Sequence, residues 1–283
     1  MKIALLINTD KQNYFTVAFE VCDHLKRLGA EILLDQEIQN QFFAPEAQYM
    51  EFDTMVQNCQ ILVALGGDGT ILHAAKRAAI FHKPILGINV GRLGFMAGLE
   101  RNELDRLSCL FSGDYTIDKR MLLQVAIERE PNICYYALND AVVSKSSLSR
   151  IIDIDLALDG KDIASYRADG IIVSTPTGST AYSLSAGGPV VDPQMSGILV
   201  TPICPHSLFA RSILFRDDKN IQLTASCLSG TDAYLTVDGE QGRLLLPGDR
   251  IHIQKAELEA SILRIKQQAF YDVLNEKLIN RRS

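Results

Sequence analysis

The hydrophobic pattern of this chain changes its period near Tyr115. Before that point, short all-apolar runs at residues 3–7, 61–65 and 85–88 alternate with stretches in which apolar residues recur every three or four positions. Short apolar runs are typical of strands buried on both faces, and the longer spacing is typical of helices. The alternation therefore predicts an α/β domain with a parallel sheet in the first part of the chain.

The second part of the chain is expected to be rich in strands. Apolar and polar residues alternate singly there, as in Ile152, Ile154 and Leu156 with aspartates between them, and this period predicts half-buried strands. Asp-Gly pairs at 159–160 and 238–239 favour tight hairpin turns. We find no convincing long helix between about Tyr115 and Ile265, and we place a β-rich second domain there.

Helices are predicted where apolar side chains line one face of the helical period. A strand at 31–34 follows the first helix, with Gly29 between them as a C-terminal cap, and Gly113 ends a later helix in the same way. The predicted helices cover residues 18–28, 71–81, 104–111 and 270–278.

Composition limits the class of protein. The 283 residues include 47% hydrophobic and 22% charged residues, which is ordinary for a globular chain, and the net charge of −6 argues against a broad nucleic-acid surface. The six cysteines form no C-x-x-C pair, and no apolar run approaches the length of a signal-peptide core or a membrane span. We expect a cytoplasmic protein that binds neither membranes nor nucleic acids.

The strongest local motif is Gly66-Gly67-Asp68-Gly69-Thr70, which follows a predicted strand and opens a predicted helix. The glycines let a ligand approach the backbone, and a helix start offers N–H groups to phosphate. A carboxylate beside that site is suited to accept a proton from an attacking hydroxyl or to hold Mg²⁺. The alternative interpretation is a plain turn with Asp68 capping the helix. The loop matches neither the P-loop nor the G-x-G-x-x-G motif.

A second glycine-rich stretch follows the next predicted strand and contains Gly87, Gly91 and Gly94. Open α/β sheets bind ligands at the carboxyl ends of their strands, which is where this stretch is expected to lie. The alternative is a tight turn with Phe95 in the core.

The β-rich part contains a polar segment at residues 167–188 that is dense in hydroxyl groups and small side chains. Such a segment can wrap a polar ligand, and Tyr182 could stack on a base or cover a ribose. Asn139 and Asp140, after a predicted strand at 134–138, offer an amide and a carboxylate to ribose hydroxyls. Taken singly, these features also fit turns, caps and a surface ion pair between Arg167 and Asp169.

Together, these segments closely resemble the NAD kinase family, of the ATP-dependent bacterial type, over most of the chain. The glycine loop alone also resembles that of diacylglycerol-type lipid kinases and, less closely, phosphofructokinases, whereas residues 169–188 are much more specific. The resemblance implies a Rossmann-like domain at 1–115 and a β-sandwich-like dinucleotide-binding domain at 116–265. It also implies that a terminal helix at 266–283 packs back on the first domain, and that subunits form homodimers or homotetramers.

The resemblance also implies roles for single residues. Asp68 would accept the proton, Gly69 would lie against the dinucleotide, and Asn139 and Asp140 would hold the adenosine part of NAD. Family members often carry Glu where this chain has Asp140, which keeps the carboxylate. No role is assigned to His206 or Glu240. The other implied residues of the dinucleotide pocket are Arg150, Arg167, Asp169, Thr180, Ala181, Tyr182, Ser183, Leu184 and Ser185.

The implied reaction is the transfer of the γ-phosphate of ATP to the 2′-hydroxyl of the adenosine ribose of NAD, in a cleft between the two domains. Mg²⁺ or another divalent metal is expected to be bound mainly through ATP, without protein metal ligands. Two other functions are weighed against it. A lipid kinase would need an apolar acceptor channel, which the polar run at 175–185 disfavours. A non-catalytic dinucleotide sensor would have no use for Asp68.

Overall fold

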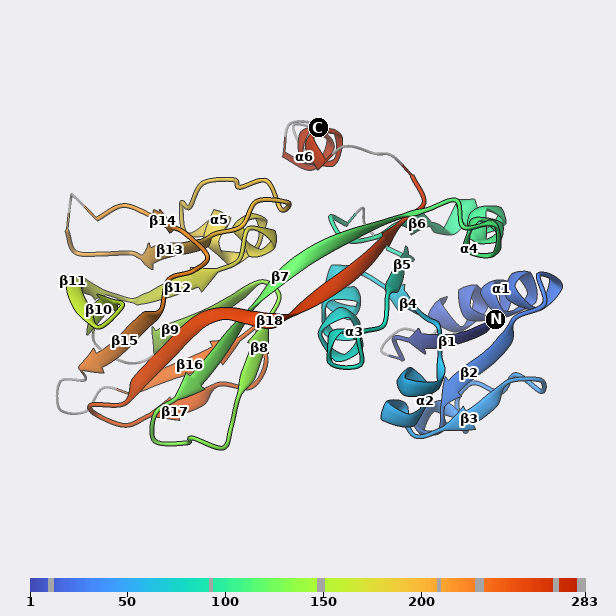
Figure 1. Ribbon diagram of the computed structural model, residues 1–283, viewed down its shortest axis with the longest axis horizontal. Coiled ribbons are helices and arrows are strands. Elements are labelled where there is room, and N and C mark those ends of the chain that lie inside the picture. Colours follow the sequence, from blue (N-terminus) through green and yellow to red (C-terminus); the bar gives the residue numbers. More distant parts are fainter. Residues whose placement is uncertain are drawn as a thin grey trace. The chain divides into compact units, whose positions relative to one another are not determined.

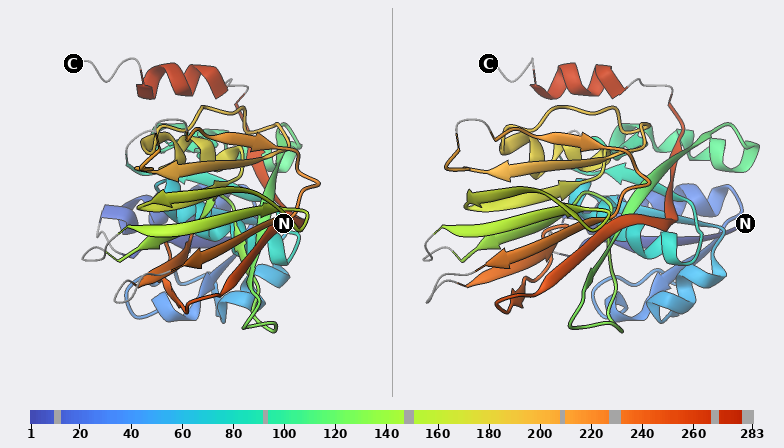
Figure 2. Two further views of the ribbon diagram at one scale, coloured as in Figure 1. Left: turned by 90° about the vertical axis from the view of Figure 1, so that its left-hand side faces the viewer. Right: turned by 60° about the vertical axis from the view of Figure 1, so that its left-hand side comes forward.

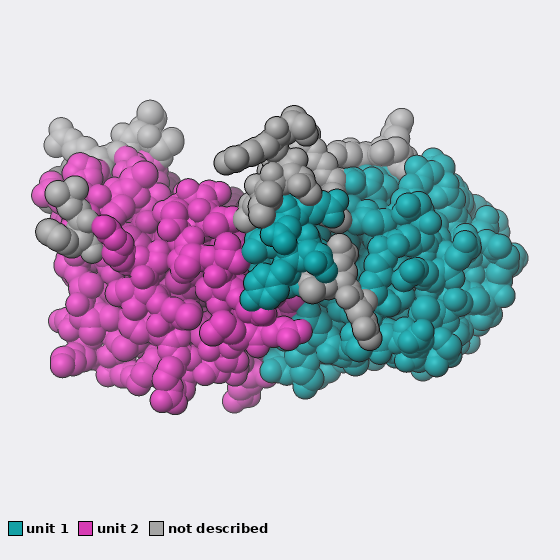
Figure 3. Space-filling view, turned by 90° about the horizontal axis from the view of Figure 1, so that it is seen from above, with its two compact units in different colours: residues 1–119, 259–283 teal, residues 120–258 magenta. Residues whose placement is uncertain are grey.

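The computed structural model describes residues 1–9, 13–91, 94–146, 151–207, 210–226, 232–266 and 270–278. The chain divides into two compact units, of which unit 1 comprises residues 1–119 and 259–283 and unit 2 comprises residues 120–258 (Figure 3). Two long strands, β7 (Thr116–Ile127) and β18 (Arg250–Arg264), run from one unit into the other.

The division differs from the ranges expected from the sequence, 1–115, 116–265 and 266–283. Residues 116–119 and 259–265 belong to unit 1 and not to the β-rich part. The reason is that β7 and β18 continue without a break through the change of unit. A strand keeps its period of two wherever it runs, so the sequence pattern alone does not mark the boundary.

Unit 1 is built on a parallel sheet with the strand order β5-β4-β1-β2-β3 (Figure 1). The chain leaves β1 toward β2 on one side, whereas β4 and β5 lie on the other side, so the strand order reverses between β1 and β4. Open sheets bind ligands at the carboxyl ends of the strands beside such a reversal. The strands are β1 (Lys2–Ile7), β2 (Glu31–Asp35), β3 (Gln48–Met50), β4 (Ile61–Gly66) and β5 (Ile85–Asn89).

Helices cover both faces of this sheet, as the all-apolar strands predict. Ile3 and Leu5 of β1 belong to one apolar cluster with Val21 of α1 (Asn13–Arg27). On the opposite face, Gly87 of β5 lies against Ile71 of α3 (Asp68–Ile80), where a Cβ atom would overlap the isoleucine side chain. A further helix, α2 (Phe52–Asn58), precedes β4.

The helix expected at 104–111 is replaced by a 3₁₀ helix, η2 (Arg101–Ser108), followed by the short α4 (Cys109–Ser112). Glu103 has non-helical dihedrals (φ −122°, ψ 19°), which interrupt a regular α-helix. The expected end at Gly113 is confirmed by its φ of +78°. Unit 1 also contains β6 (Leu99–Glu100) and α6 (Phe270–Leu278), and the Phe270 ring lies 6.0 Å from that of Phe95.

Unit 2 is an antiparallel β-sandwich, which confirms the predicted fold class. One sheet contains parts of β7 and β18 with β8 (Tyr135–Ala137), β10 (Ile152–Leu158), β11 (Lys161–Ala168) and β15 (Ile221–Ser226). The other, part of which is seen from two further sides in Figure 2, has the order β14-β13-β12-β9-β16-β17. Its strands are β9 (Asp140–Lys145), β12 (Gly170–Ser174), β13 (Ile198–Ile203), β14 (Ile213–Phe215), β16 (Ala233–Val237) and β17 (Arg243–Leu245).

One core lies between these two sheets. Ile154 and Leu156 of β10 share an apolar cluster with Ile171 and Val173 of β12, and all four side chains are fully buried. The described helices of unit 2 are short, η3 (Thr177–Thr180) and α5 (Tyr182–Ser185). No helix in the described ranges is long and apolar enough to cross a membrane.

Both predicted Asp-Gly turns are tight hairpin turns with positive φ at two successive residues. Asp159 and Gly160 have φ of 50° and 80°, and Asp238 and Gly239 have φ of 49° and 73°. Two successive residues with positive φ are the signature of the type I′ turn, whose twist matches that of the flanking strands.

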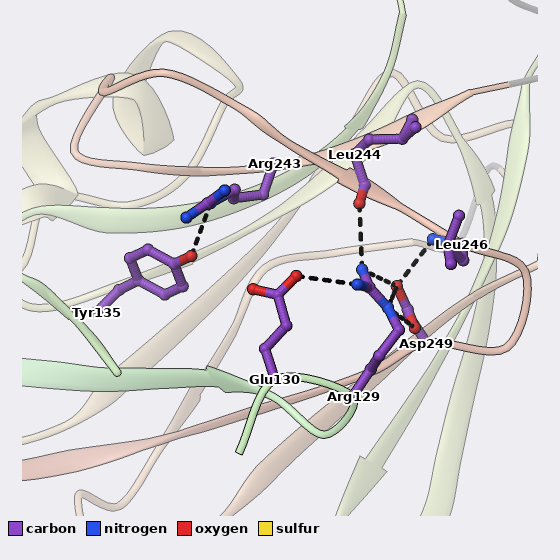
Figure 4. Close-up of polar contacts among 7 residues, drawn as sticks. All are labelled: Arg129, Glu130, Tyr135, Arg243, Leu244, Leu246 and Asp249. Atoms are coloured by element: carbon purple, nitrogen blue, oxygen red, sulfur yellow. Dashed lines mark hydrogen bonds and ion pairs between the residues drawn. The ribbon is translucent and has the colours of Figure 1, made fainter. Parts of the chain in front are cut away.

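A polar cluster around Arg129 ties turn segments of unit 2 together (Figure 4). Arg129 donates to both oxygens of Asp249, with Nε–Oδ1 and Nη2–Oδ2 distances of 3.0 Å each, and its Nη1 donates to Glu130 at 3.0 Å. The Leu246 N–H donates to Asp249 at 2.8 Å. The hydrogen bonds from Arg129 are the main reason why the pKa of Asp249 is lowered. This cluster contains none of the residues predicted for the site.

Candidate functional site

The Gly66–Thr70 loop lies where the strand order of unit 1 reverses. β4 ends at Gly66, and α3 begins at Asp68 with Gly67 as its N-cap residue. A Cβ atom on residue 66 would overlap the Thr70 side chain, so only glycine allows the helix to start so close to the strand. Asn8, which follows β1, donates from Nδ2 to Thr70 Oγ1 at 2.9 Å. This bond joins the carboxyl ends of β1 and β4 on either side of the reversal.

The carboxylate of Asp68 is held by the second glycine-rich stretch. The Phe95 N–H donates to Oδ2 at 3.0 Å, and the Met96 N–H donates to Oδ1 at 3.1 Å. Gly94 must lack a side chain, because a Cβ atom there would overlap the carboxylate. The two glycine stretches that the sequence suggested separately are therefore one structure.

The first turn of α3 adds backbone donors beside this carboxylate. The first N–H groups of a helix have no partner within the helix and carry its partial positive charge. Gly67 provides no capping side chain, and Gly69 is exposed. Since Gly67 is the N-cap residue and Asp68 reaches a distant segment, the plain-cap interpretation of Asp68 does not describe this loop. The arrangement can bind an anion and accept a proton next to it.

In unit 2, the carboxylate of Asp238 organises the Asn139-Asp140 pair. Its oxygens accept the N–H groups of Leu138, Asn139 and Asp140 at 2.9, 2.8 and 3.0 Å. In return, the Asp238 N–H donates to the Asp140 carbonyl oxygen at 2.9 Å. A carboxylate that receives three consecutive backbone donors fixes the conformation of that segment.

The start of the polar segment packs on the same pair. The Thr175 N–H donates to the Asn139 carbonyl oxygen at 2.9 Å, and the Thr175 hydroxyl donates to the Leu138 carbonyl oxygen at 2.5 Å. Gly178 must lack a side chain, because a Cβ atom there would overlap the Asn139 carbonyl group. The structure thus brings Asn139, Asp140 and residues 175–178 together within unit 2.

Asp140 is the first residue of β9 rather than part of a turn, and it is only 5% exposed. Burial, together with the nearby charge of Asp238, raises the pKa of Asp140 to about 7. Near neutral pH it can therefore be either a carboxylate that accepts hydrogen bonds or a carboxyl group that also donates one.

The run from Thr180 to Ser185 does not present all its side chains to solvent. Tyr182 and Ser185 are exposed, and Thr180, Ala181 and Leu184 are half-buried. Ser183 is fully buried, and its hydroxyl shares a hydrogen bond of 2.9 Å with Thr201 of β13. Ser183 therefore anchors α5 to the sheet, whereas the Tyr182 side chain is exposed.

The ion pair between Arg167 and Asp169, the alternative interpretation of these two residues, is not among the ion pairs of the described residues. Asp169 pairs with Lys145 of β9, with an Nζ–Oδ1 distance of 2.8 Å, and the Lys145 N–H donates to the Asp169 carbonyl oxygen at 3.0 Å. Arg167 lies exposed on β11, and its carbonyl oxygen accepts the His206 N–H at 2.8 Å. Arg150 lies outside the described residues.

Four residues that shape the candidate site were not predicted for it from the sequence: Lys145, Phe95, Met96 and Asp238. Lys145 has no motif, and the donors at Phe95 and Met96 are backbone groups that no side-chain pattern reveals. Asp238 was predicted only as a turn residue, although the Asp-Gly pair was a usable signal, since aspartate in such turns readily accepts backbone N–H groups. No group of three or more His, Cys, Asp or Glu residues within the described ranges could hold a metal ion.

Two family models match the chain over its two units. The model of the ATP-NAD kinase N-terminal domain matches residues 3–114, and the model of the ATP-NAD kinase C-terminal domain matches residues 138–265. Among relatives, the NAD kinase of Symbiobacterium thermophilum is 40% identical over 280 residues, with 98% of each chain covered. The NAD kinase of Carboxydothermus hydrogenoformans is 42% identical over 231 residues, which cover 81% of this chain and 82% of that one.

Solved structures agree with these matches. A yeast NADH kinase in complex with NADH has a TM-score of 0.88 and 26% identity, covering 100% of this chain and 88% of that one. An NAD kinase from Archaeoglobus fulgidus in complex with ATP has a TM-score of 0.73 and 27% identity, covering 99% and 98%.

Proposed function

Since this chain belongs to the NAD kinase family, we propose that it transfers the γ-phosphate of ATP to the 2′-hydroxyl of the adenosine ribose of NAD, giving ADP and NADP. One observation carries the mechanism. A carboxylate, Asp68, is fixed by two backbone N–H groups at the start of a helix, where phosphate binding is favoured.

Asp68 is the proposed general base. A ribose hydroxyl is a weak nucleophile at neutral pH, and transfer of its proton to Asp68 accompanies formation of the new O–P bond. The bond between the γ-phosphorus and the bridging oxygen breaks, and ADP leaves with that electron pair. Most of the rate gain in phosphoryl transfer comes from positioning and charge stabilisation, so the fixed orientation of Asp68 matters as much as its basicity.

The dinucleotide is proposed to lie against Gly69 and to be held by the pair Asn139 and Asp140. The Asn139 amide and the Asp140 carboxylate suit ribose hydroxyls and the adenine edge, and Asp238 keeps their backbone fixed. Tyr182 is exposed for stacking, whereas Ser183 acts through packing. The other residues proposed for this pocket are Arg150, Arg167, Asp169, Thr180, Ala181, Leu184 and Ser185.

A kinase that uses ATP needs a divalent metal, and we propose Mg²⁺. Both oxygens of Asp68 accept backbone N–H groups, which supports a metal that is bound mainly through ATP. When bound, Mg²⁺ would neutralise charge on the triphosphate. We further propose a homodimer or homotetramer in the cytoplasm; both statements remain predictions.

A coupled assay tests the function directly. Purified protein with ATP, Mg²⁺ and NAD should form NADP, detected by an NADP-specific dehydrogenase. An NAD analogue that lacks the adenosine 2′-hydroxyl should bind without reacting. Phosphate on another hydroxyl would overturn the proposed orientation, and binding of NAD without any transfer would instead support a dinucleotide sensor. Phosphorylation of diacylglycerol but not of NAD would support the lipid kinase alternative.

A further inference from the structure

We propose that Arg264 is a positioning residue for the reaction, and that it orients Asp68 through the backbone of residues 95–97. The inference rests on the proposed function, in which Asp68 is the general base. Arg264 is the last residue of β18, far from the glycine loop in the sequence, and no motif points to it.

The guanidinium group of Arg264 donates hydrogen bonds to the segment of residues 95–97, which holds Asp68. Its Nη2 donates to the Phe95 carbonyl oxygen at 3.1 Å, and its Nη1 donates to the Ala97 carbonyl oxygen at 2.9 Å and to that of Met96 at 3.5 Å. The segment therefore offers its carbonyl groups to Arg264 and two of its N–H groups to Asp68.

One peptide group links the two side chains directly. The Phe95 carbonyl and the Met96 N–H belong to the same planar unit, and in a trans peptide they point in opposite directions. When Arg264 holds the carbonyl at 3.1 Å, the N–H is turned toward Asp68 Oδ1, which it reaches at 3.1 Å. A donor on one side of a peptide also polarises the group and strengthens the hydrogen bond on its other side.

The chemistry at this position favours arginine over lysine. A planar fork can bind several carbonyl groups of one segment at once, whereas an ammonium group provides a single point of attachment. The Nε atom lies 3.5 Å from Asp118 Oδ2, and the side chain of Asp118 is only 10% exposed. Asp118 thereby balances the charge of Arg264 and restricts its orientation.

Loss of Arg264 should therefore affect catalysis more than substrate binding. Misplacing a catalytic group by about 1 Å can reduce the rate by about 100-fold. The residues proposed to hold NAD in unit 2 do not depend on this contact.

The test compares kcat and the KM for NAD in Arg264→Gln, Arg264→Lys and Asp118→Asn. For Arg264→Gln we expect kcat to fall about 10- to 100-fold and the KM for NAD to stay within about threefold. Arg264→Lys keeps the positive charge, so its kcat should lie between those of Arg264→Gln and the unaltered protein. If Arg264→Gln does not fold, the lysine variant is compared with the unaltered protein instead. Asp118→Asn should show a smaller loss of the same kind.

Arg129→Gln is the matched control, because Arg129 also binds a carboxylate with its fork but lies in the turn cluster of unit 2. It should lower the melting temperature and leave kcat and the KM for NAD unchanged. A double variant completes the test: in an Asp68→Asn background, Arg264→Gln should cause little further loss, since both act on the same step.

Two results would overturn the inference. They are an undiminished effect of Arg264→Gln in the Asp68→Asn background, and a loss of activity that lies in the KM for NAD while kcat is unchanged. The proposed function fails in a different way, if the unaltered protein forms no NADP or Asp68→Asn keeps its full kcat.

Discussion

Asp68 of unit 1 and Asp238 of unit 2 both accept hydrogen bonds from backbone N–H groups of segments distant in the sequence. The two carboxylates differ in what they support. Asp68 is itself the proposed reacting group, and the backbone of residues 95 and 96 orients it. With Asp238 the relation is reversed, because the carboxylate orients the backbone that carries Asn139 and Asp140. The same interaction thus positions the proposed catalytic side chain in one unit and the proposed binding segment in the other.

The comparison predicts that changes around the two carboxylates affect different kinetic constants. Disturbing the contacts around Asp68 should change kcat, whereas disturbing those around Asp238 should change the KM for NAD. An interaction that is made only in the transition state affects kcat, and one that is equally strong in the ground state affects KM. The predictions below follow this separation from the largest expected effect to the smallest.

Asp68→Asn should give the largest effect. The amide keeps the size of the carboxylate but cannot accept the ribose proton, so we expect kcat to fall by about 10²–10⁴, the usual range for a lost general base. The KM for NAD should change much less. Steady-state kinetics at saturating ATP and NAD measure both quantities.

A metal-binding role for Asp68 would give a different result, since the variant would need more Mg²⁺ and high Mg²⁺ would partly restore the rate. If Asp68→Asn kept a near-normal kcat, the carboxylate would serve only the local structure of the loop, and the first half of the comparison would be lost.

Asp238→Ala should raise the KM for NAD by about 10- to 100-fold with a smaller change in kcat, because three backbone N–H groups lose their acceptor and the Asn139-Asp140 segment loses its conformation. Asp159→Ala is the matched control. Asp159 occupies the same type of Asp-Gly turn and accepts the Asn220 N–H at 3.0 Å, but Asn220 is not a predicted site residue. Equal effects of the two variants on KM would show that Asp238 is only a turn residue.

Much of the fold could be predicted because hydrophobic period is a local property. The all-apolar run of β4, the alternation of β10 and the positive φ at Gly29 and Gly113 all follow from neighbouring residues. The sequence could not predict that β7 and β18 each continue from one unit into the other. This continuation depends on which strands pair with the two ends of β7 and β18.

The candidate site was predictable to the same extent. Asp68, Asn139 and Asp140 stand in short sequence motifs, so the sequence could point to them as candidate site residues. Asp238 and Arg264 act on segments roughly 100 to 170 residues away, so only the folded chain reveals them. Within the hydroxyl-rich segment, the sequence did not show which serine side chains of the short α5 face the core.

Asp140→Asn should stabilise the protein at neutral and higher pH. Burial and the charge of Asp238 raise the pKa of Asp140 to about 7 from the ordinary value of 3.8. The folded state thus binds this proton more tightly than the unfolded state. The contribution of Asp140 to stability is complete below about pH 4, falls as the pH rises to about 7, and is constant above that.

Removing the buried charge should therefore raise the free energy of unfolding by about 1–4 kcal/mol at pH 8 and by much less at pH 4. Urea unfolding at the two pH values measures this difference. We expect a weaker affinity for NAD in the same variant, a cost often seen when a binding group is replaced for stability. An equal change at both pH values would show that the pKa of Asp140 is not raised in the folded state.

Asp249→Asn should have the smallest effect, and its pH dependence should have the opposite sign. The pKa of Asp249 is lowered, mainly by the hydrogen bonds from Arg129, so its contribution to stability is present near neutral pH and is lost as the pH falls through the lowered pKa. We expect the melting temperature to fall by about 2–4 °C at pH 7, as for a modest loss of charge-assisted hydrogen bonds in a chain of this size. The difference from the unaltered protein should shrink in acid.

Since Asp249 accepts the Leu246 N–H but supports no predicted site residue, kcat and KM should stay unchanged in this variant. Asp249 is thus a third carboxylate in the comparison. It accepts a backbone N–H group, that of Leu246, but no ligand-binding residue is predicted beside it. A changed KM for NAD in Asp249→Asn would mean that the turn cluster also shapes the dinucleotide pocket. In that case, the effect of Asp238→Ala on KM could no longer be assigned to the Asn139-Asp140 segment alone.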